Sequence, residues 1–126
     1  MNKKSPIREI FVFQGYYKES YCQINLYNLP TPVVIISELK ANQGTSATNC
    51  IETVVSGITQ KHRLDPQNII FIHHCPEGQG IFFGREDFHR VPVQWNGEAF
   101  EMTTSGKWQE LTRSEVEQLI NSSFEN

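Results

Sequence analysis

The sequence predicts an α+β fold: a mostly antiparallel sheet of about six or seven strands, one β-α-β crossover helix and a C-terminal helix. Three observations lead to this prediction. The run Val33-Val34-Ile35-Ile36 is β-branched throughout, which is typical of a strand covered on both faces. Apolar residues of 47–62 instead recur at three- and four-residue spacing, as in an amphipathic helix. Asn96-Gly97, between two apolar segments, is the strongest hairpin signal in the chain.

The first part of the chain predicts an antiparallel meander. Residues 1–6 are expected to be a loose tail. Ile7–Phe13 and Tyr21–Leu29 each alternate between two faces, and a turn region containing Gly15 separates them. The segment 28–32, with prolines at 30 and 32, ends the second strand, and the run at 33–36 is then the third strand of the meander.

A helix follows this third strand. Thr45 or Ser46 is expected to cap its first turn, and Asp65-Pro66 ends it. Gly57 inside the helix costs about 1 kcal/mol relative to alanine, which a close packing contact would explain. The apolar stripe of this helix contains Ala47, Cys50, Ile51, Val54, Val55, Ile58 and His62.

Asn68–His74 is the fourth predicted strand. Strand, helix and strand of these lengths permit a right-handed parallel crossover. The loops at 43–49 and 74–80 would then follow the carboxyl ends of two parallel strands and lie at the same edge of the sheet.

The later strands are shorter. Ile81–Phe83 is expected to be a strand and Glu86-Asp87 a polar interruption. Arg90–Trp95 and Glu98–Thr104 flank Asn96-Gly97, and a two-residue turn there requires positive φ at both positions. That register pairs Trp95 with Glu98, Val93 with Phe100, and Val91 with Met102.

The C-terminal region predicts a short strand at Lys107–Gln109 and a helix at Arg113–Ser123. Thr112 and Glu115 have the spacing of a capping box, and Leu111 and Val116 that of a hydrophobic staple. The buried stripe of the helix is expected to contain Val116, Leu119, Ile120 and Phe124.

Length and composition limit the class of protein. The 126 residues suit a single domain, 1–126, and the sequence contains no apolar run of the roughly 20 residues that a membrane helix needs. Residues 1–85 carry a net charge of +2 and residues 86–126 a net charge of −5, without a basic cluster in either part. Phosphate-led nucleic-acid binding is therefore disfavoured. An N-terminus without a signal-peptide apolar region favours the cytoplasm.

Three cysteines, Cys22, Cys50 and Cys75, are an odd number without metal-site spacing. A disulfide framework is therefore not expected. Buried thiols of this kind act as small hydrophobic side chains.

Two regions of the chain resemble a family of small uncharacterised bacterial proteins. The first is Gly44-Thr45-Ser46-Ala47-Thr48-Asn49 with Glu52, followed by Leu64-Asp65-Pro66 and an apolar strand that ends near His74. The second is the Asn-Gly hairpin, Trp108 and the terminal Glu-Val-Glu-Gln-Leu-Ile helix. The resemblance covers the last two-thirds of the chain. It implies a bacterial, cytosolic, one-domain protein and assigns no functional residue, because we associate no activity with this pattern.

The best candidate ligand site in the sequence is the loop before the first helix. Free backbone N–H groups at a helix N-terminus hold anions, and His74 would lie at the neighbouring strand end. A small anion or a carboxylate-bearing ligand would suit this place. The alternative reading is structural: the hydroxyls cap the helix and Gly44 relieves a turn. The candidate ligand-binding residues are Gly44, Thr45, Ser46, Thr48, Asn49 and His74.

The histidines and Cys75 suggest two further chemistries. His73 and His74 are adjacent on a strand, so they point to opposite faces and cannot share one metal ion without a bulge. For this reason no metal site and no cofactor are expected. A nucleophilic Cys75 would need His89 or His62 as its base. The sequence leaves open whether His73, His74, Cys75 or His89 has a chemical role.

No convergent catalytic set can be assembled from the sequence, so a non-enzymatic bacterial binding or accessory protein is the expected function. The alternative is a small enzyme or ligand-binding protein that uses the loop Gly44–Asn49 and the strand end at His74. A protein partner or a second copy could bind at an edge strand or at a tyrosine-rich patch. The tyrosines of this patch are Tyr16, Tyr17, Tyr21 and Tyr27.

Overall fold

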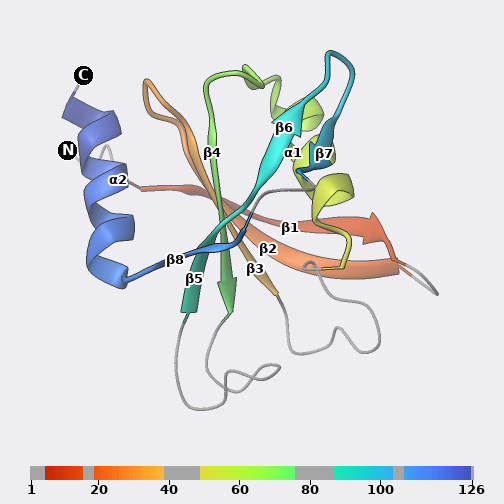
Figure 1. The fold of residues 1–126 in the computed structure, drawn as a ribbon, viewed down its shortest axis with the longest axis horizontal. Helices are drawn as coiled ribbons and strands as arrows, with labels where there is room; N and C mark the ends of the chain where they lie inside the picture. Colours follow the sequence, from red (N-terminus) through yellow and green to blue (C-terminus); the bar gives the residue numbers. More distant parts are fainter. Residues whose placement is uncertain (1–4, 16–18, 39–48, 76–86, 104–106, 126) are drawn as a thin grey trace.

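The structure is a computed structural model that describes residues 5–15, 19–38, 49–75, 87–103 and 107–125 (Figure 1). The helices are α1 (Ile51–His62) and α2 (Arg113–Glu125). The strands are β1 (Ile7–Gln14), β2 (Glu19–Tyr27), β3 (Val33–Glu38), β4 (Ile70–Cys75), β5 (Asp87–Arg90), β6 (Val93–Trp95), β7 (Phe100–Met102) and β8 (Gln109–Leu111).

The described strands form one six-stranded sheet of order β1-β2-β3-β4-β5-β8 and a separate two-stranded sheet, β6-β7. Every neighbouring pair is antiparallel except β3 and β4, which are parallel. The predicted α+β class, with its mostly antiparallel sheet, is therefore confirmed. No helix among the described residues is long and apolar enough to cross a membrane.

The meander and the crossover are confirmed as well. β1, β2 and β3 pair antiparallel in sequence order, and α1 connects β3 to its parallel neighbour β4. Ser37 lies opposite His74, so the carboxyl ends of the two parallel strands do lie side by side. The predicted strand Ile81–Phe83 falls outside the described residues.

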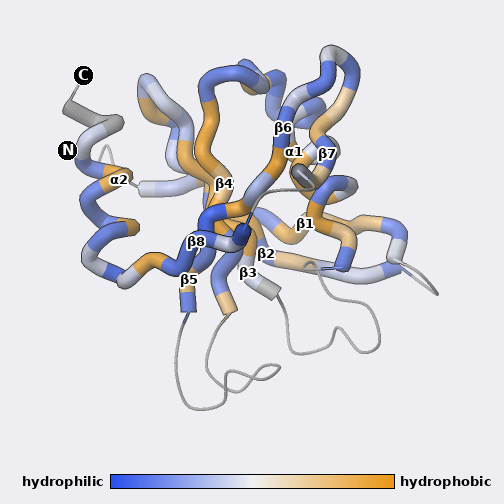
Figure 2. The backbone as a smooth tube through the Cα atoms, in the orientation of Figure 1, coloured by the Kyte–Doolittle hydropathy of each residue, from blue (hydrophilic) through white to orange (hydrophobic). Residues whose placement is uncertain are grey.

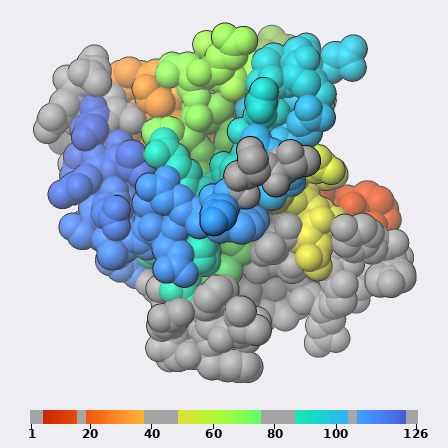
Figure 3. Space-filling view, viewed as in Figure 1, coloured from red at the N-terminus to blue at the C-terminus, as the bar shows by residue number. Residues whose placement is uncertain are grey.

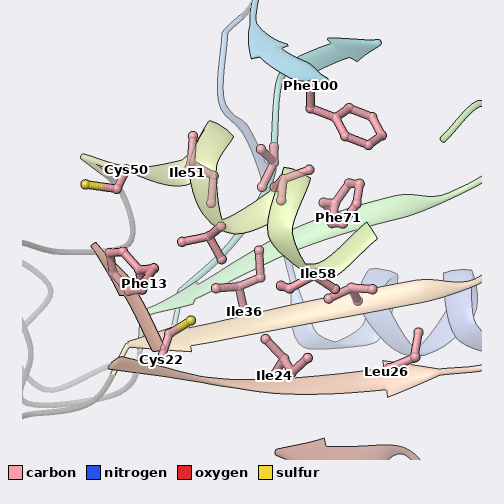
Figure 4. Packing of buried hydrophobic residues seen from close by; sticks show 14 residues of the cluster. Phe13, Cys22, Ile24, Leu26, Ile36, Cys50, Ile51, Ile58, Phe71 and Phe100 are labelled. Atoms are coloured by element: carbon pink, nitrogen blue, oxygen red, sulfur yellow. The ribbon is translucent and has the colours of Figure 1, made fainter. Parts of the chain in front are cut away.

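Each face of the large sheet is covered by its own layer. Even-numbered residues of β3, such as Val34 and Ile36, pack with α1 and with Phe100 of the small sheet (Figure 4). Odd-numbered residues, Val33 and Ile35, pack with α2. We call the two sides the α1 face and the α2 face. Figure 1 shows the strands between the two helices, and Figure 2 shows hydrophobic residues concentrated along β4 and the strands beside it.

The first helix begins later than the sequence suggested. Its first residue is Ile51, and the capping residue Cys50 makes no side-chain cap hydrogen bond. Thr45 and Ser46, the predicted caps, lie outside the described residues. At the other end the helix stops before Asp65 because Arg63 adopts a left-handed conformation, with φ of 53°. The backbone N–H of the following residue, Leu64, donates to the carbonyl of Thr59.

The late strands differ from the prediction. β8 is Gln109–Leu111 where Lys107–Gln109 was expected, and Asp87, expected in a polar interruption, belongs to β5. Two further differences are larger. The first is that Arg90–Trp95 is not one strand. Asp87–Arg90 belongs to the large sheet and Val93–Trp95 to the small one. The N–H of Val91 still donates to the carbonyl of Phe71, one position beyond the Ile72–Arg90 pair of β4 and β5. The break follows at Pro92 because proline has no N–H to continue a ladder.

The second difference is the hairpin register. Trp95 pairs with Phe100 and Val93 with Met102, so the turn has four residues, 96–99, where two were expected. The Asn96 side-chain oxygen accepts hydrogen bonds from the N–H groups of Glu98 and Ala99, at 2.8 and 3.0 Å. Of the two turn residues only Gly97 has a positive φ, 106°. The asparagine therefore closes the wider turn with its side chain, and the Trp95 and Phe100 rings pack at 5.3 Å.

The predicted start of the C-terminal helix is confirmed. The Thr112 hydroxyl accepts from the Glu115 N–H and the Glu115 carboxylate accepts from the Thr112 N–H, both at 3.1 Å. This is the reciprocal arrangement of a capping box. Leu111 and Val116, the predicted staple, are both buried in the α2-face cluster. Ile120 is buried there too, and Leu119 is partly buried.

Gly57 has the close contact that a glycine in the middle of a helix calls for. A Cβ built at this position would overlap Cζ of Phe11 and lie 3.3 Å from the two neighbouring ring carbons. The missing side chain therefore lets α1 pack directly on the ring of Phe11 in β1.

A shared carboxylate forms a second contact between β1 and α1. Glu9 Oε1 lies 2.8 Å from His62 Nε2 and 3.1 Å from Lys61 Nζ, at the end of the helix. Burial raises the pKa of Glu9. The hydrogen bonds and charges of His62 and Lys61 outweigh this effect and hold the pKa below the ordinary carboxyl value.

We predict that the effect of Gly57→Ala changes sign with residue 11. In the wild-type background the new methyl group meets the Phe11 ring and should lower the free energy of unfolding. In a Phe11→Ala background the obstacle is gone, and the same change should raise the free energy of unfolding by about 1 kcal/mol through helix propensity. Urea denaturation of the four proteins measures this. An equal effect of Gly57→Ala in both backgrounds would contradict the packing role of the glycine.

We predict that Glu9 contributes stability that acid removes. A carboxyl whose pKa is depressed in the folded state stabilises the protein above its unfolded pKa, and this stability is lost as the pH falls through the folded pKa. Glu9→Gln should therefore lower the denaturation midpoint at neutral pH, and its difference from wild type should shrink as the pH falls through the folded pKa of Glu9. Glu117→Gln on the exposed side of α2 is the control and should have only a small effect on the midpoint.

Candidate functional site

Only part of the predicted ligand loop can be placed. Gly44, Thr45, Ser46 and Thr48 lie outside the described residues. Asn49 is exposed and immediately precedes Cys50, the N-cap residue of α1. A ligand site in this loop therefore stays a prediction.

His74, the sixth predicted residue, lies half-buried on the α2 face. Its Nδ1 is 3.1 Å from the Ser37 hydroxyl, and its ring stacks on Phe88 at 4.5 Å. Burial lowers the pKa of His74, and the electrostatic interactions with Arg113 and His73 lower it further. Among the described residues, the neighbours of His74 are therefore Ser37 of β3, Phe88 of β5 and Arg113 of α2. α1 lies on the opposite face of the sheet.

The structure brings together a different set of side chains on the α1 face, at the carboxyl end of β4. His73 and Cys75 are two residues apart on that strand, so they point to the same face. His89 lies directly opposite His73 in the antiparallel neighbour β5. All three are buried, with exposed fractions of 2% for His73, 6% for Cys75 and 8% for His89. We call them the His73–Cys75–His89 cluster.

The donor atoms of this cluster are close to one another. Cys75 Sγ lies 3.4 Å from His73 Nδ1, and one ligand atom from each of the three residues falls within 4.8 Å of the others. The two imidazole rings are stacked, with centroids 6.3 Å apart. Trp108 packs beside both, 5.8 Å from the His73 ring and 5.9 Å from the His89 ring. The sheet and an indole therefore enclose two nitrogen donors and one sulfur donor.

These separations are close to those of a metal site. A tetrahedral zinc ion with bonds of about 2.0–2.3 Å holds its ligand atoms about 3.3–3.6 Å apart. The Cys75–His73 pair already has this spacing. The largest separation, up to 4.8 Å, exceeds the tetrahedral value by about 1 Å, so metal binding requires these side chains to move closer together. Three protein ligands also leave a fourth position for water or another donor.

The same atoms fit a cysteine nucleophile less well. A base that the sequence did not suggest, His73, has its Nδ1 3.4 Å from Cys75 Sγ. His62, one of the two bases that the sequence suggested, is bound to Glu9 at the end of α1. Reactive cysteines are partly exposed to their substrates, whereas the exposed fraction of Cys75 is 6%. Burial therefore favours metal binding over nucleophilic catalysis.

The sequence contained half of the signal for this cluster. The spacing His-x-Cys on a strand places residues 73 and 75 on one face. The argument against a metal site from the sequence, however, was based on the adjacent pair His73 and His74. That pair does lie on opposite faces: His73 packs near Trp108 and His74 on Phe88. His89 could be added only after the pairing of β4 with β5 was known, because no motif connects it to His73 and Cys75 in the sequence.

Only two of the four tyrosines predicted as a patch lie among the described residues, so the patch stays a prediction. Tyr21 is exposed on β2, with an exposed fraction of 41%. Tyr27, on the same strand, packs partly buried against the α2-face cluster. Tyr16 and Tyr17 lie outside the described residues.

Comparisons with family models, with curated proteins and with solved structures find no match to this chain. The functional conclusion therefore depends on the geometry of the His73–Cys75–His89 cluster.

Proposed function

We propose that this protein binds a transition-metal ion through His73, Cys75 and His89. The observation that carries the proposal is the convergence of three buried donor atoms, from two paired strands, within 4.8 Å of one another. The sequence led us to expect no metal site, so this proposal differs from that expectation. A metal titration distinguishes between them.

The donor set selects the class of metal. Two imidazole nitrogens and one thiolate suit zinc or copper, whereas magnesium and calcium require oxygen ligands. Zinc fits best, because a tetrahedral ion accepts these donors and a fourth ligand without a strong geometric preference of its own. The ion would join β4 to β5 on the α1 face and add a cross-link to the hydrogen-bonded pair.

A non-enzymatic binding role agrees with this site. The cluster lies deep in the structure, and Trp108 covers both imidazoles. Metal held there would stabilise the carboxyl end of the central strand pair or be stored by the protein. A cytoplasmic location in a bacterium, which the sequence favours, would keep Cys75 reduced and available as a thiolate ligand.

The first test is a cobalt and zinc titration of chelator-treated protein. Wild type should bind one Co²⁺ per chain with a sulfur-to-metal charge-transfer band, because a thiolate ligand produces one. Zn²⁺ should displace the cobalt. Free zinc at 100 times its dissociation constant should stabilise the fold by about 2.7 kcal/mol, measured by urea denaturation.

Variants locate the ligands. Cys75→Ser should abolish the charge-transfer band, and His89→Asn should weaken cobalt binding at least about tenfold. Cys50→Ser is the matched control: Cys50 is also a buried free thiol, but it lies outside the cluster and should leave the band unchanged. A wild type that neither binds cobalt nor gains stability with zinc would refute metal binding here.

A second prediction uses the two tryptophans. Trp108 packs on both imidazoles, so metal binding should change its fluorescence. Trp95 packs on Phe100 in the small sheet and should not respond. The fluorescence change on adding Zn²⁺ should therefore disappear in Trp108→Phe and persist in Trp95→Phe. The reverse pattern would place the metal elsewhere in the molecule.

A further inference from the structure

The α2 face of the large sheet is covered unevenly. α2 and its buried residues cover β3, β4, β5 and β8, through side chains such as Ile35, Ile72 and Leu111. On β1 and β2 the same face exposes Ile10, Val12 and Tyr21, with exposed fractions of 50%, 48% and 41%. Val12 lies opposite Tyr21, and Ile10 is two residues from Val12 on the same strand, so the three form one continuous patch. We call it the β1–β2 patch.

The patch adjoins a sheet edge. β1 is the outermost strand of the large sheet, and it pairs with β2 over eight consecutive residues without a bulge. Edge strands of monomers are usually protected by proline, lysine or a bulge. β1 contains no proline or lysine, and the segment from Ile10 to Phe13 carries no charge. This edge is therefore suited to pairing with another strand.

We propose that two copies of this chain pair through β1, antiparallel, and join their β1–β2 patches. A two-fold axis perpendicular to the sheet leaves each face on its own side, so a residue can lie opposite only a partner residue of the same face. The registers centred on Ile10 and on Phe11 both satisfy this condition. The charges and the apolar side chains distinguish between them.

The register centred on Phe11 places apolar side chains opposite apolar side chains and polar ones opposite polar ones on the patch side of the sheet. It places Ile10 opposite the partner's Val12, in one row with the partner's Tyr21. Arg8 lies opposite the partner's Gln14, which is paired with the partner's Glu19. Arg8, Gln14 and Glu19 are all exposed. Arg8 of one copy therefore lies on the same side as Glu19 of the other, with only Gln14 between them, twice by symmetry around an apolar centre.

The register centred on Ile10 lacks this match. It would place Arg8 opposite the partner's Val12, which sets a charge against the apolar centre. On the α1 face, the register centred on Phe11 also brings the two Phe11 side chains opposite each other, as an aromatic cross-strand pair. The same surface carries Arg8 at one end, on β1, and Glu19 at the other, on β2, so it complements a second copy of itself; this favours a second copy over an unrelated protein as the occupant.

The first experiment measures the oligomeric state of the full chain by sedimentation velocity and light scattering over a range of concentrations. Wild type should be a dimer. Val12→Lys and Ile10→Lys should be monomers with unchanged circular dichroism, because both positions are already half exposed. Gln118→Lys, which adds the same charge on the exposed side of α2, should remain a dimer. A monomeric wild type, or a dimer that survives both lysine substitutions, overturns the proposal.

The second experiment tests the register. Opposed positions in an antiparallel pair have Cα atoms about 4.5–5.5 Å apart, within the range of a disulfide. Ile10→Cys mixed with Val12→Cys should form an intermolecular disulfide under mild oxidation, and neither variant alone should do so efficiently. Efficient cross-linking of Ile10→Cys with itself would instead give the register centred on Ile10 and overturn the one proposed.

Discussion

The parallel pairing of β3 with β4 is the constraint on which the rest of this structure depends. Two parallel neighbours require a crossover, and α1 supplies it. The helix must then lie on one face of the sheet, where Val54, Val55 and Ile58 are completely buried. Figure 4 shows Ile58 between α1 and the strands of the sheet, and Phe71 and Phe100 next to each other beside the helix. α2, the last element of the chain, packs on the opposite face, and Figure 3 shows it in blue beside β8.

Burial of β4 on both faces determines where its polar side chains can lie. Successive residues of a strand alternate between faces, so His73 and Cys75 enter the α1 layer while His74 enters the α2 layer. A buried imidazole must have polar partners to offset its lost hydration. His74 has the Ser37 hydroxyl at 3.1 Å. His73 has the Cys75 thiol at 3.4 Å, with His89 stacked beside it. In the proposed function, a metal ion would bind to this polar cluster, whose side chains already lie together because residues of a strand alternate between faces.

The two proposals concern separate parts of the sheet. The His73–Cys75–His89 cluster lies on β4 and β5, whereas the β1–β2 patch lies at the outer edge, with β3 between them in the strand order. Metal binding would stiffen the centre of the sheet, and dimerisation would extend the sheet at β1. Substitutions in one site should therefore leave the other unchanged, because nothing in the strand order makes them share a residue.

Local patterns in the sequence determined most of the secondary structure and part of the site. The β-branched run at 33–36, the helical stripe around Ile58 and the capping box at Thr112 each act over a few residues, so their structures could be predicted. Tertiary contacts decided the rest. The turn after Trp95 widened because the Asn96 side chain bonds two backbone N–H groups and lets Trp95 pack on Phe100. His89 lies near Cys75 because β5 pairs with β4. This pairing is non-local, so the spacing of residues in the sequence could not predict it.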